Sequence, residues 1–334
     1  MTDLEPLSPE EGVDRFLEHR APSVRESTLS NARTRLRFFL EWCDREDIGN
    51  LNDLTGRLLA EFVEWRGEQL AAISLQKQVS TLRVACRFWA DIEAVEEGLA
   101  EKIHAPELPD GSVARDIHLE ADRADAILEA LDRYAYASRE HVVLGLLWRT
   151  GMRRGALHAI DVDDYHPDDA AIELVHRPET DTPLKNGADG ERWVYLGPTW
   201  SEIVEDYIAN PDRYDIRDDY GRWPLVTTAQ GRASENTIYS TVHRATQPCR
   251  IGDCPHGRDP DDCEAVGGAS VPYKCPSSVS PHAVRRGTIT AHLNDDVPTE
   301  IVSERADVSV EVLYQHYDAR TQREKMDARR RYFK

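Results

Sequence analysis

Residues 105–118, APELPDGSVARDIH, show neither helical nor strand periodicity and divide the chain into two parts. A stretch that combines prolines with glycine in this way is typical of a linker. At 334 residues the chain is also too long for one ordinary hydrophobic core. We therefore predict two domains, residues 8–104 and residues 119–334, joined by this linker.

The first domain has a helical pattern throughout. In STLSNARTRLRFFLEW, residues 27–42, apolar side chains such as Leu36 and Phe39 lie near one face, whereas Arg33 and Arg37 lie on the others. The simplest interpretation is a small all-α domain whose aromatic residues form its core. A further interpretation is that the arginine-bearing faces rest on a DNA backbone, because phosphate contacts come from Lys and Arg.

The second domain combines helices with short strands. Residues 121–133 and 139–150 have helical patterns. The segments AIELVH (171–176) and RWVYLG (192–197) are rich in β-branched and aromatic residues, and the polar turn LKNGADGE lies between them. We expect a mainly α fold with a small antiparallel β-sheet, of the α+β class.

The net charge of -20 argues against a nucleic-acid partner if it is taken alone. The location of charges matters more than their sum, however. Only six of the 41 basic residues are lysines, whereas Asp and Glu together number 61. Such an acidic, lysine-poor composition suits a cytoplasm of very high salt, where charge repulsion is screened. We therefore hypothesise a halophilic host, which predicts that the protein unfolds on dialysis into dilute buffer.

The sequence contains no apolar run near the roughly 18 residues of a membrane span. Its first residues, MTDLEPLSPEEG, lack a basic and apolar leader. We therefore expect a cytoplasmic protein without a membrane partner.

The segment SPHAVRRGTITAHL predicts a helix with a histidine and an arginine on one face. Ser280 is a suitable N-cap and Pro281 a suitable first residue. His282 and Arg285 follow three residues apart and therefore share a face. A guanidinium group can bind two phosphate oxygens at once, and a histidine can carry a proton. The pair fits phosphoryl chemistry, although the same spacing is common by chance.

Two further cations precede this helix in the chain. Arg153 follows a glycine in TGMRRGAL, where we expect a helix to break and expose the side chain. Lys185 is the only lysine between Lys102 and Lys274, and it lies in the polar turn. A lysine can give a proton to a leaving oxygen, whereas arginine does not deprotonate. A surface arginine and a solvated turn lysine are the alternative interpretations.

The segment SERADVSVEVLYQHY adds Arg305 and Tyr314. A phenol can attack phosphorus, but its ordinary pKa near 10 means that it needs nearby positive charge and a base. Together with two guanidinium groups on different elements, this tyrosine indicates a site that breaks and rejoins DNA strands.

These motifs, in this order, resemble those of the tyrosine recombinase (phage integrase) family. TGMRRGALHAIDVDDY resembles the first arginine box and implies Arg153, and LKNGADGERWVYLG resembles the hairpin lysine motif and implies Lys185. SPHAVRRGTITAHL resembles the His-x-x-Arg box and implies His282 and Arg285. SERADVSVEVLYQHY resembles the closing segment, whose tyrosine before x-His is the nucleophile, here Tyr314. The N-terminal helices resemble the core-binding domain, so the resemblance covers nearly the whole chain.

The resemblance implies a helical core-binding domain, followed by a catalytic domain that forms a 3′-phosphotyrosyl intermediate without a catalytic metal or nucleotide. It implies that the two domains close around duplex DNA and that four protomers form a synapse. Each protomer would pass a C-terminal segment to its neighbour. The arginine-rich tail, residues 319–334, is the candidate segment, with a solvated helix end or a DNA-binding arm as alternatives.

The chain departs from the family pattern at several positions. Arg305 stands where the family usually has a histidine; it could donate a hydrogen bond to phosphate but could not act as a neutral acceptor. Ala156 replaces the usual acidic residue, which could loosen how Arg153 is held. Tyr317 lies on a helical face similar to that of Tyr314 and competes with it as the nucleophile. Two alternatives therefore remain: a catalytically impaired DNA-binding regulator on the same scaffold, and a strand-relaxing enzyme that does not form a synapse.

A cysteine-rich insertion, residues 249–275, precedes the His282 helix and contains four of the six cysteines. Thiolates gathered this closely in an intracellular protein hold zinc more often than they form disulfides. We predict a structural zinc site, with free or paired thiols as the alternative. Five residues are candidates for its four ligand positions: Cys249, Cys254, His256, Cys263 and Cys275.

Overall fold

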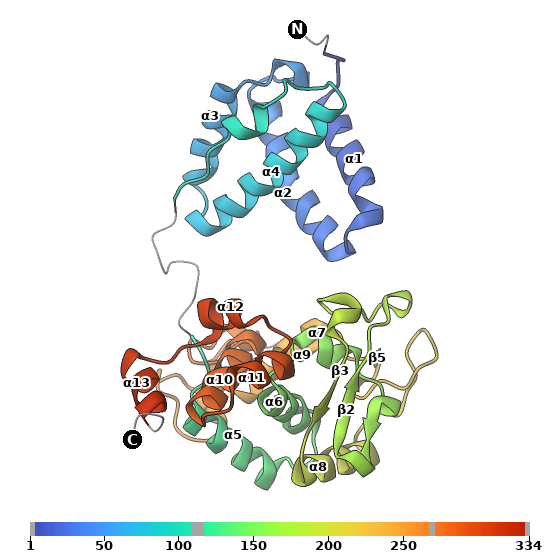
Figure 1. Ribbon diagram of the computed structural model, residues 1–334, viewed down its shortest axis with the longest axis vertical. Helices are drawn as coiled ribbons and strands as arrows, with labels where there is room; N and C mark the ends of the chain where they lie inside the picture. The colour runs from blue at the N-terminus through green and yellow to red at the C-terminus, as the bar shows by residue number, and fades with distance from the viewer. Residues whose placement is uncertain (1–3, 108–116, 267–270, 331–334) are drawn as a thin grey trace. The chain divides into compact units, whose positions relative to one another are not determined.

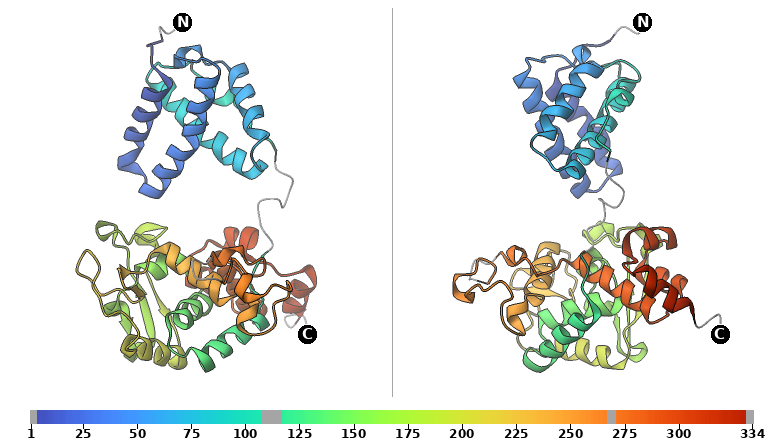
Figure 2. Two further views of the ribbon diagram at one scale, coloured as in Figure 1. Left: turned by 180° about the vertical axis from the view of Figure 1, so that it is seen from behind. Right: turned by 90° about the vertical axis from the view of Figure 1, so that its left-hand side faces the viewer.

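The computed structural model describes residues 4–107, 117–266 and 271–330. The chain forms two compact units, Met1–Arg115 and Asp116–Lys334 (Figures 1 and 2). The middle of the predicted linker, residues 108–116, lies outside the described residues. Each unit has a hydrophobic core of its own, and the second contains a further small cluster of buried apolar residues.

The N-terminal unit is all-helical (Figure 1). The helices are α1 (Pro9–Arg20), α2 (Glu26–Arg45), α3 (Gly56–Gly67) and α4 (Ala72–Asp91), with short 3-10 turns η1 (Ala21–Ser23), η2 (Leu51–Asp53) and η3 (Leu99–Lys102). Local signals explain where two of these helices begin. The side chain of Ser8 accepts a hydrogen bond from the backbone of Glu11, and Thr55 does the same for Leu58.

Aromatic side chains form the centre of this unit. Phe39 and Phe62 are buried, and their rings meet edge to face with centroids 5.8 Å apart. Trp89 is buried as well, and its indole nitrogen donates to the backbone oxygen of Gly12 at 2.7 Å. The prediction that these aromatic residues form the core is confirmed.

The second unit contains most of the helices. They are α5 (Ala121–Tyr134), α6 (Arg139–Thr150), α7 (Arg154–Ala159), α8 (Pro198–Ala209), α9 (Glu235–Ala245), α10 (Pro281–Asn294), α11 (Thr299–Ala306), α12 (Val310–Val312) and α13 (Gln322–Arg330). Short 3-10 turns are η4 (Val162–Asp164), η5 (Pro167–Asp169), η6 (Pro178–Thr180), η7 (Gly187–Gly190), η8 (Pro248–Arg250), η9 (Pro260–Asp262) and η10 (Pro272–Lys274). A single π-helical turn, η11 (Leu313–Tyr317), follows α12.

Helix α6 is buried along most of its length and contacts α5, α8, α9 and α10. Gly145 allows the closest of these approaches, because a Cβ there would lie 1.9 Å from the ring of Trp200 on α8. Gly287 has the same function on α10, where a Cβ would lie 2.1 Å from the backbone oxygen of Leu119. These two glycines fix α6 and α10 in tight packing with their neighbours.

Two small antiparallel sheets complete the second unit. Strands β1 (Tyr165–His166), β2 (Ala171–Leu174) and β3 (Arg192–Tyr195) form a sheet in the order β1-β2-β3, and β4 (Thr227–Thr228) pairs with β5 (Gly231–Arg232). In the larger sheet Ile172 faces Val194, and β2 and β3 lie to one side of the helices (Figure 1). The predicted fold class, mainly α with a small antiparallel sheet, is confirmed. None of the helices in the described parts of the chain is long and apolar enough to cross a membrane.

Candidate active site

Arg153 lies where one helix stops and another begins. Helix α6 ends at Thr150, and Gly151 follows with φ 64°, a left-handed conformation that favours glycine. Arg153 is then the N-cap residue of α7. The predicted helix break is confirmed. The Arg153 side chain is 27% exposed, and its Nη1 contacts the carboxylate of Asp307.

Helix α10 presents His282 and Arg285. The hydroxyl of Ser280 accepts a hydrogen bond from the backbone of Ala283 at 3.3 Å, and Pro281 is the first helical residue, so the predicted N-terminus is confirmed. His282 is exposed, whereas Arg285 is only 2% exposed. His282 is therefore accessible from solvent, whereas Arg285 is enclosed by the protein.

Arg285 joins segments that lie far apart in the sequence. Its Nη1 donates to the backbone oxygen of Gly151 at 2.6 Å and to that of Ala306, and its Nη2 donates to the backbone oxygen of Asp307 at 3.5 Å. Burial lowers the pKa of Arg285, and the nearby Tyr317 side chain opposes this. The Nε atom is buried and has no hydrogen-bond partner within the described ranges. One N–H donor of this guanidinium is thus left unsatisfied.

Asp307 lies among three guanidinium groups. Its Oδ2 contacts Arg153 and is 4.0 Å from Nη1 of Arg192, and its Oδ1 accepts from Nδ2 of Asn186 at 2.7 Å. Arg192 donates from Nε to the backbone oxygen of Arg305 at 3.0 Å. Burial lowers the pKa of Arg192 to about 10, which Asp307 opposes and the neighbouring arginines reinforce. The structure therefore brings Arg153, Arg192 and Arg285 together around one carboxylate.

Sequence reasoning missed both Arg192 and Asp307. A signal for Arg192 was present, because in β3 it lies two residues before the buried Val194 and strand alternation places both on the inner face. Asp307 carries no comparable local signal. It becomes significant only through contacts with residues more than 100 positions earlier in the chain.

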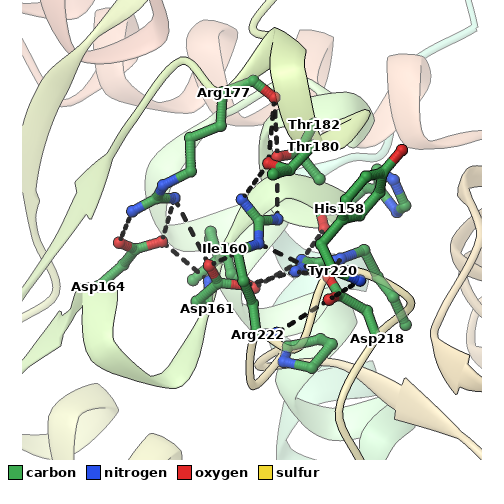
Figure 3. A network of polar contacts seen from close by, with 12 residues as sticks. His158, Ile160, Asp161, Asp164, Arg177, Thr180, Thr182, Asp218, Tyr220 and Arg222 are labelled. Carbon is green, nitrogen blue, oxygen red and sulfur yellow. Dashed lines mark hydrogen bonds and ion pairs between the residues drawn. The ribbon is translucent and has the colours of Figure 1, made fainter.

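Lys185 is exposed in the segment that connects β2 and β3, directly before Asn186. A network of charged side chains fixes the beginning of this segment (Figure 3). Arg177 donates from Nη1 to Asp164 at 2.9 Å. Arg222 donates to the hydroxyls of Thr180 at 2.7 Å and Thr182 at 3.0 Å. The segment that carries Lys185 is thus anchored at its base.

The same network continues into the body of the unit (Figure 3). Nε of Arg222 lies 3.3 Å from Asp161, and Arg232 pairs with both Asp161 and Asp218. Burial raises the pKa of Asp161, and Arg232 opposes this shift. Alternating acidic and basic side chains therefore hold the loop before β4, strand β5 and the β2–β3 connection together.

The two candidate tyrosines have different environments. Tyr317 is 8% exposed, its ring lies 4.9 Å from Cζ of Arg285, and its centroid is 5.3 Å from that of the His282 ring. Tyr314 is 51% exposed, and its hydroxyl lies 3.1 Å from Oγ1 of Thr299. In this conformation Arg285 and His282 therefore lie beside Tyr317, while the hydroxyl of Tyr314 lies against α11.

His282 can act as a proton acceptor near neutral pH. Desolvation by the surrounding side chains lowers its pKa, and the positive charges of Arg285, Arg286 and Arg153 lower it further. The neutral imidazole is consequently the favoured form, and it lies within ring contact of a phenol. The site can in principle neutralise a phosphate and accept a phenolic proton.

Comparisons with known proteins agree with the fold of the chain. The family model "Phage integrase, N-terminal SAM-like domain" matches residues 13–91. The Tn1549 transposon integrase in complex with transposon right end DNA has a TM-score of 0.70 at 12% identity, covering 98% of this chain and 100% of that one. A lambda integrase tetramer bound to a Holliday junction has a TM-score of 0.65 at 15% identity, covering 95% of this chain and 80% of that one.

A further match is the N-terminal domain of a phage integrase/site-specific recombinase from Haloarcula marismortui. It is 35% identical and covers 30% of this chain and 99% of that one, with a TM-score of 0.30. No curated protein matches the chain.

The chain belongs to the tyrosine recombinase (phage integrase) family. Its N-terminal unit contains the SAM-like core-binding domain of the family, and its second unit has the fold of the integrase catalytic domain.

Arg305 is predicted at the position of the usual histidine of the family, and its described side-chain contacts are with the backbone. Its Nη2 donates to the backbone oxygens of Arg149 at 2.9 Å and Tyr195 at 2.8 Å. Burial lowers the pKa of Arg305 to about 10, and the positive charge of Arg149 adds to this effect. Arg305 thereby ties α11 to the end of α6 and to β3. Its predicted hydrogen bond to phosphate stays a prediction.

The predicted zinc ligands lie in the cysteine-rich insertion, residues 249–275, of which residues 267–270 are outside the described ranges. Among the described residues, no three His, Cys, Asp or Glu side chains form a group that could hold a metal ion. His256 lies with its Nε2 3.0 Å from the hydroxyl of Ser277. Burial raises the pKa of Cys249, and the nearby thiols of Cys275 and Cys254 add to this effect. The zinc site stays a prediction, and no part of the chemistry is assigned to a metal.

Proposed function

We propose that the chain is a site-specific DNA recombinase or integrase that cuts and rejoins duplex DNA through a 3′-phosphotyrosyl intermediate. The observation that carries the proposal is the convergence of three guanidinium groups and one imidazole beside the tyrosine-bearing turn η11. These side chains are Arg153, Arg192, Arg285 and His282.

Charge neutralisation is the first task of such a site. Arg153 and Arg285 would bind the non-bridging oxygens of the scissile phosphate, where negative charge concentrates in the transition state. The buried Nε of Arg285 has no hydrogen-bond partner among the described residues, and it would have to become accessible to the phosphate when DNA binds. Arg192 would add positive charge from the inner face of β3.

Bond exchange then needs one nucleophile, one base and one acid. The Tyr314 oxygen would form a bond to phosphorus while the bond from phosphorus to the 5′ oxygen breaks. The phenolic proton would pass to His282, and the Lys185 ammonium would give a proton to the leaving 5′ oxygen. Rejoining would follow the same steps in reverse, so no external energy source is needed.

Tyr314 is the proposed nucleophile because its hydroxyl lies on an exposed side chain and matches the position of the family's tyrosine before x-His. Tyr317 instead packs in the small core formed with Ile289 and Leu313. Tyr314 would have to leave Thr299 and approach the cations when DNA binds. Tyr317 is the second candidate, since its ring already lies beside Arg285 and His282.

A pool of nicked suicide duplexes of randomised sequence tests this proposal, because a nick near the cleaved bond traps the covalent adduct. We expect an adduct with the unmodified chain and with Tyr317→Phe, and none with Tyr314→Phe. If only Tyr317→Phe failed to form the adduct, Tyr317 rather than Tyr314 would be identified as the nucleophile. DNA binding without any adduct would contradict strand transfer and favour the regulator.

A DNA-binding regulator on the same scaffold is the second candidate function. The observation in its favour is that Arg305, predicted at the position of the usual histidine, donates hydrogen bonds to the backbone carbonyls of Arg149 and Tyr195. Recombination of two sites, as opposed to relaxation of supercoiled DNA alone, separates a recombinase from a strand-relaxing enzyme.

Assembly of four protomers on DNA through exchange of the tail, residues 319–334, is also proposed. Support comes from the lambda integrase tetramer bound to a Holliday junction. In the present conformation the beginning of the tail contacts α10 of its own chain, because Arg320 donates from Nη1 to the backbone oxygen of Leu293 at 3.1 Å and the N–H of Ala319 donates to Oγ1 of Thr290 at 3.2 Å. Exchange that moves these residues would require the two hydrogen bonds to open. The halophilic host stays a prediction, tested by dialysis into dilute buffer.

A further inference from the structure

One acidic side chain, Asp307, lies inside the cationic candidate site. Its carboxylate is 15% exposed and contacts groups from three other parts of the unit. Oδ2 contacts Arg153 at the start of α7 and lies 4.0 Å from Arg192 on β3. Oδ1 accepts from Asn186, the residue next to Lys185, at 2.7 Å. The carboxylate thus links an arginine of the site to the lysine-bearing segment.

The backbone fixes the position of this carboxylate. Asp307 terminates α11 with φ 54°, a conformation that Asp and Asn tolerate better than most residues. Its N–H donates to the last turn of α11, and Val308 donates to the backbone oxygen of Ser303 at 3.0 Å. The carbonyl of Asp307 accepts from Nη2 of Arg285 at 3.5 Å. The end of α11 and the buried Arg285 therefore position the backbone of Asp307 independently of its side-chain contacts.

The Lys185 segment packs against Asp307. A Cβ at Gly190 would lie 3.4 Å from Oδ2 of Asp307, so this turn packs against the carboxylate. Lys185 itself is exposed, and its neighbour Asn186 makes the described polar contact with the body of the unit. The network of Arg177 and Arg222 anchors only the beginning of the segment. The contact between Asn186 and Asp307 anchors its far end.

We propose that Asp307 is a positioning residue that holds Arg153 and the Lys185 segment in register with each other. This inference rests on the proposed strand-transfer function. Ala156, one turn after Arg153 on α7, offers no carboxylate for this purpose. Asp307 supplies that carboxylate from α11, and in the same contact it fixes the distance between the phosphate-binding arginine and the proton-donating lysine.

The negative charge of Asp307 makes it possible to distinguish a positioning role from a role in phosphate binding. A carboxylate repels an incoming phosphate, so its neutralisation does not weaken DNA binding through charge. Replacement by asparagine removes the charge-assisted hydrogen bond to Arg153, and replacement by glycine also removes the acceptor for Asn186. The rate of strand cleavage therefore falls, while the affinity for DNA stays the same or rises. General unfolding would instead lower both.

Asp307→Asn and Asp307→Gly test the inference in the full chain, since both residues accept the left-handed backbone conformation. In single-turnover cleavage of the suicide duplex at saturating DNA, we expect the rate to fall about 10- to 100-fold. This is the effect expected from the loss of one hydrogen bond to a charged group. The matched control is Glu235→Gln, which neutralises the carboxylate that pairs with the adjacent Arg154 at 2.7 Å. It should cleave at the unmodified rate. Cleavage by Asp307→Asn at that rate, or a parallel loss of DNA affinity, would overturn the inference.

Amide hydrogen exchange gives a second readout that does not depend on cleavage. In Asp307→Gly the amides of Gly187 and Glu191 should exchange about tenfold faster, because the segment loses its hydrogen bond from Asn186 to the Asp307 side chain. Amides of the β2–β3 ladder should not change. Equal protection at Gly187 and Glu191 in both proteins would contradict the positioning role. An unmodified chain that forms no adduct would contradict the proposed function instead, and the exchange result would still decide whether Asp307 holds the segment.

Discussion

Different interactions stabilise the two units of this chain, each within itself. The N-terminal unit depends on buried aromatic rings, such as Phe39, Phe62 and Trp89, that pack around one another. The second unit has an apolar core as well, but charged side chains fix its β2–β3 connection and its candidate site. Apolar packing is non-directional, whereas ion pairs and charge-assisted hydrogen bonds hold named atoms at set distances. The difference fits the proposal that the second unit places cations around a phosphate.

The largest expected effect concerns the aromatic core. Phe62 is fully buried and touches the rings of Phe39 and Trp42. Phe62→Ala should therefore lower the free energy of unfolding of the N-terminal unit by about 3–5 kcal/mol. Chemical denaturation of the chain measures this loss, which should hardly change with salt. A loss below about 1 kcal/mol, within the range of a surface substitution, would contradict the assignment of Phe62 to the core.

The next effect concerns chemistry in the second unit. His282→Gln should slow cleavage about 100-fold if His282 accepts the phenolic proton. The pKa of His282 is lowered in the folded protein, so its neutral, accepting form persists at neutral pH. The value of kcat/KM should therefore be constant near pH 7 and fall only below about pH 6.5, as the imidazole gains a proton. An acid limb that survives unchanged in His282→Gln would assign the base to another group.

A smaller effect is expected within the ion network. Arg222→Met removes the hydrogen bonds to Thr180 and Thr182, but Asp161 and Asp218 keep Arg232 as a partner. The expected loss of unfolding free energy is about 1–3 kcal/mol. Cleavage should slow as well, because the base of the Lys185 segment loosens. A variant as stable and as active as the unmodified chain would contradict the claim that charged side chains fix the β2–β3 connection of the second unit.

The smallest effect is expected on the surface of the N-terminal unit. Arg37 lies 3.4 Å from Glu41 one turn along α2, and both side chains are more than half exposed. Such pairs contribute about 0.5 kcal/mol or less. Arg37→Ala should leave the unfolding free energy nearly unchanged. If it weakens DNA binding with a reduced salt dependence, the arginine-bearing face of α2 contacts the DNA backbone.

Local signals explain which features were predictable from the sequence. Ser280 and Pro281 define the start of α10, Gly151 ends α6, and alternation with a polar turn identifies β2 and β3. Each signal depends on residues within a few positions of one another, where backbone preferences decide the outcome. The spacing of His282 and Arg285 followed directly from the helix.

Long-range contacts explain what the sequence did not reveal. Asp307 meets Arg153 and Asn186 across more than 100 positions, and no local preference indicates such a pairing. The same limit applies to the tyrosines, because helical spacing alone did not separate Tyr314 from Tyr317. The guanidinium of Arg305 meets carbonyls of α6 and β3 that become neighbours only in the folded unit.

The most direct test of the central claim is to identify the residue that carries DNA after suicide cleavage. The adduct would be digested with protease and nuclease, and the modified peptide sequenced by mass spectrometry. The account predicts a 3′-phosphate linked to Tyr314 in the peptide that contains LYQHY, with a free 5′ hydroxyl on the released strand. A linkage to the 5′ end, a modified residue other than Tyr314, or the absence of any adduct would contradict it.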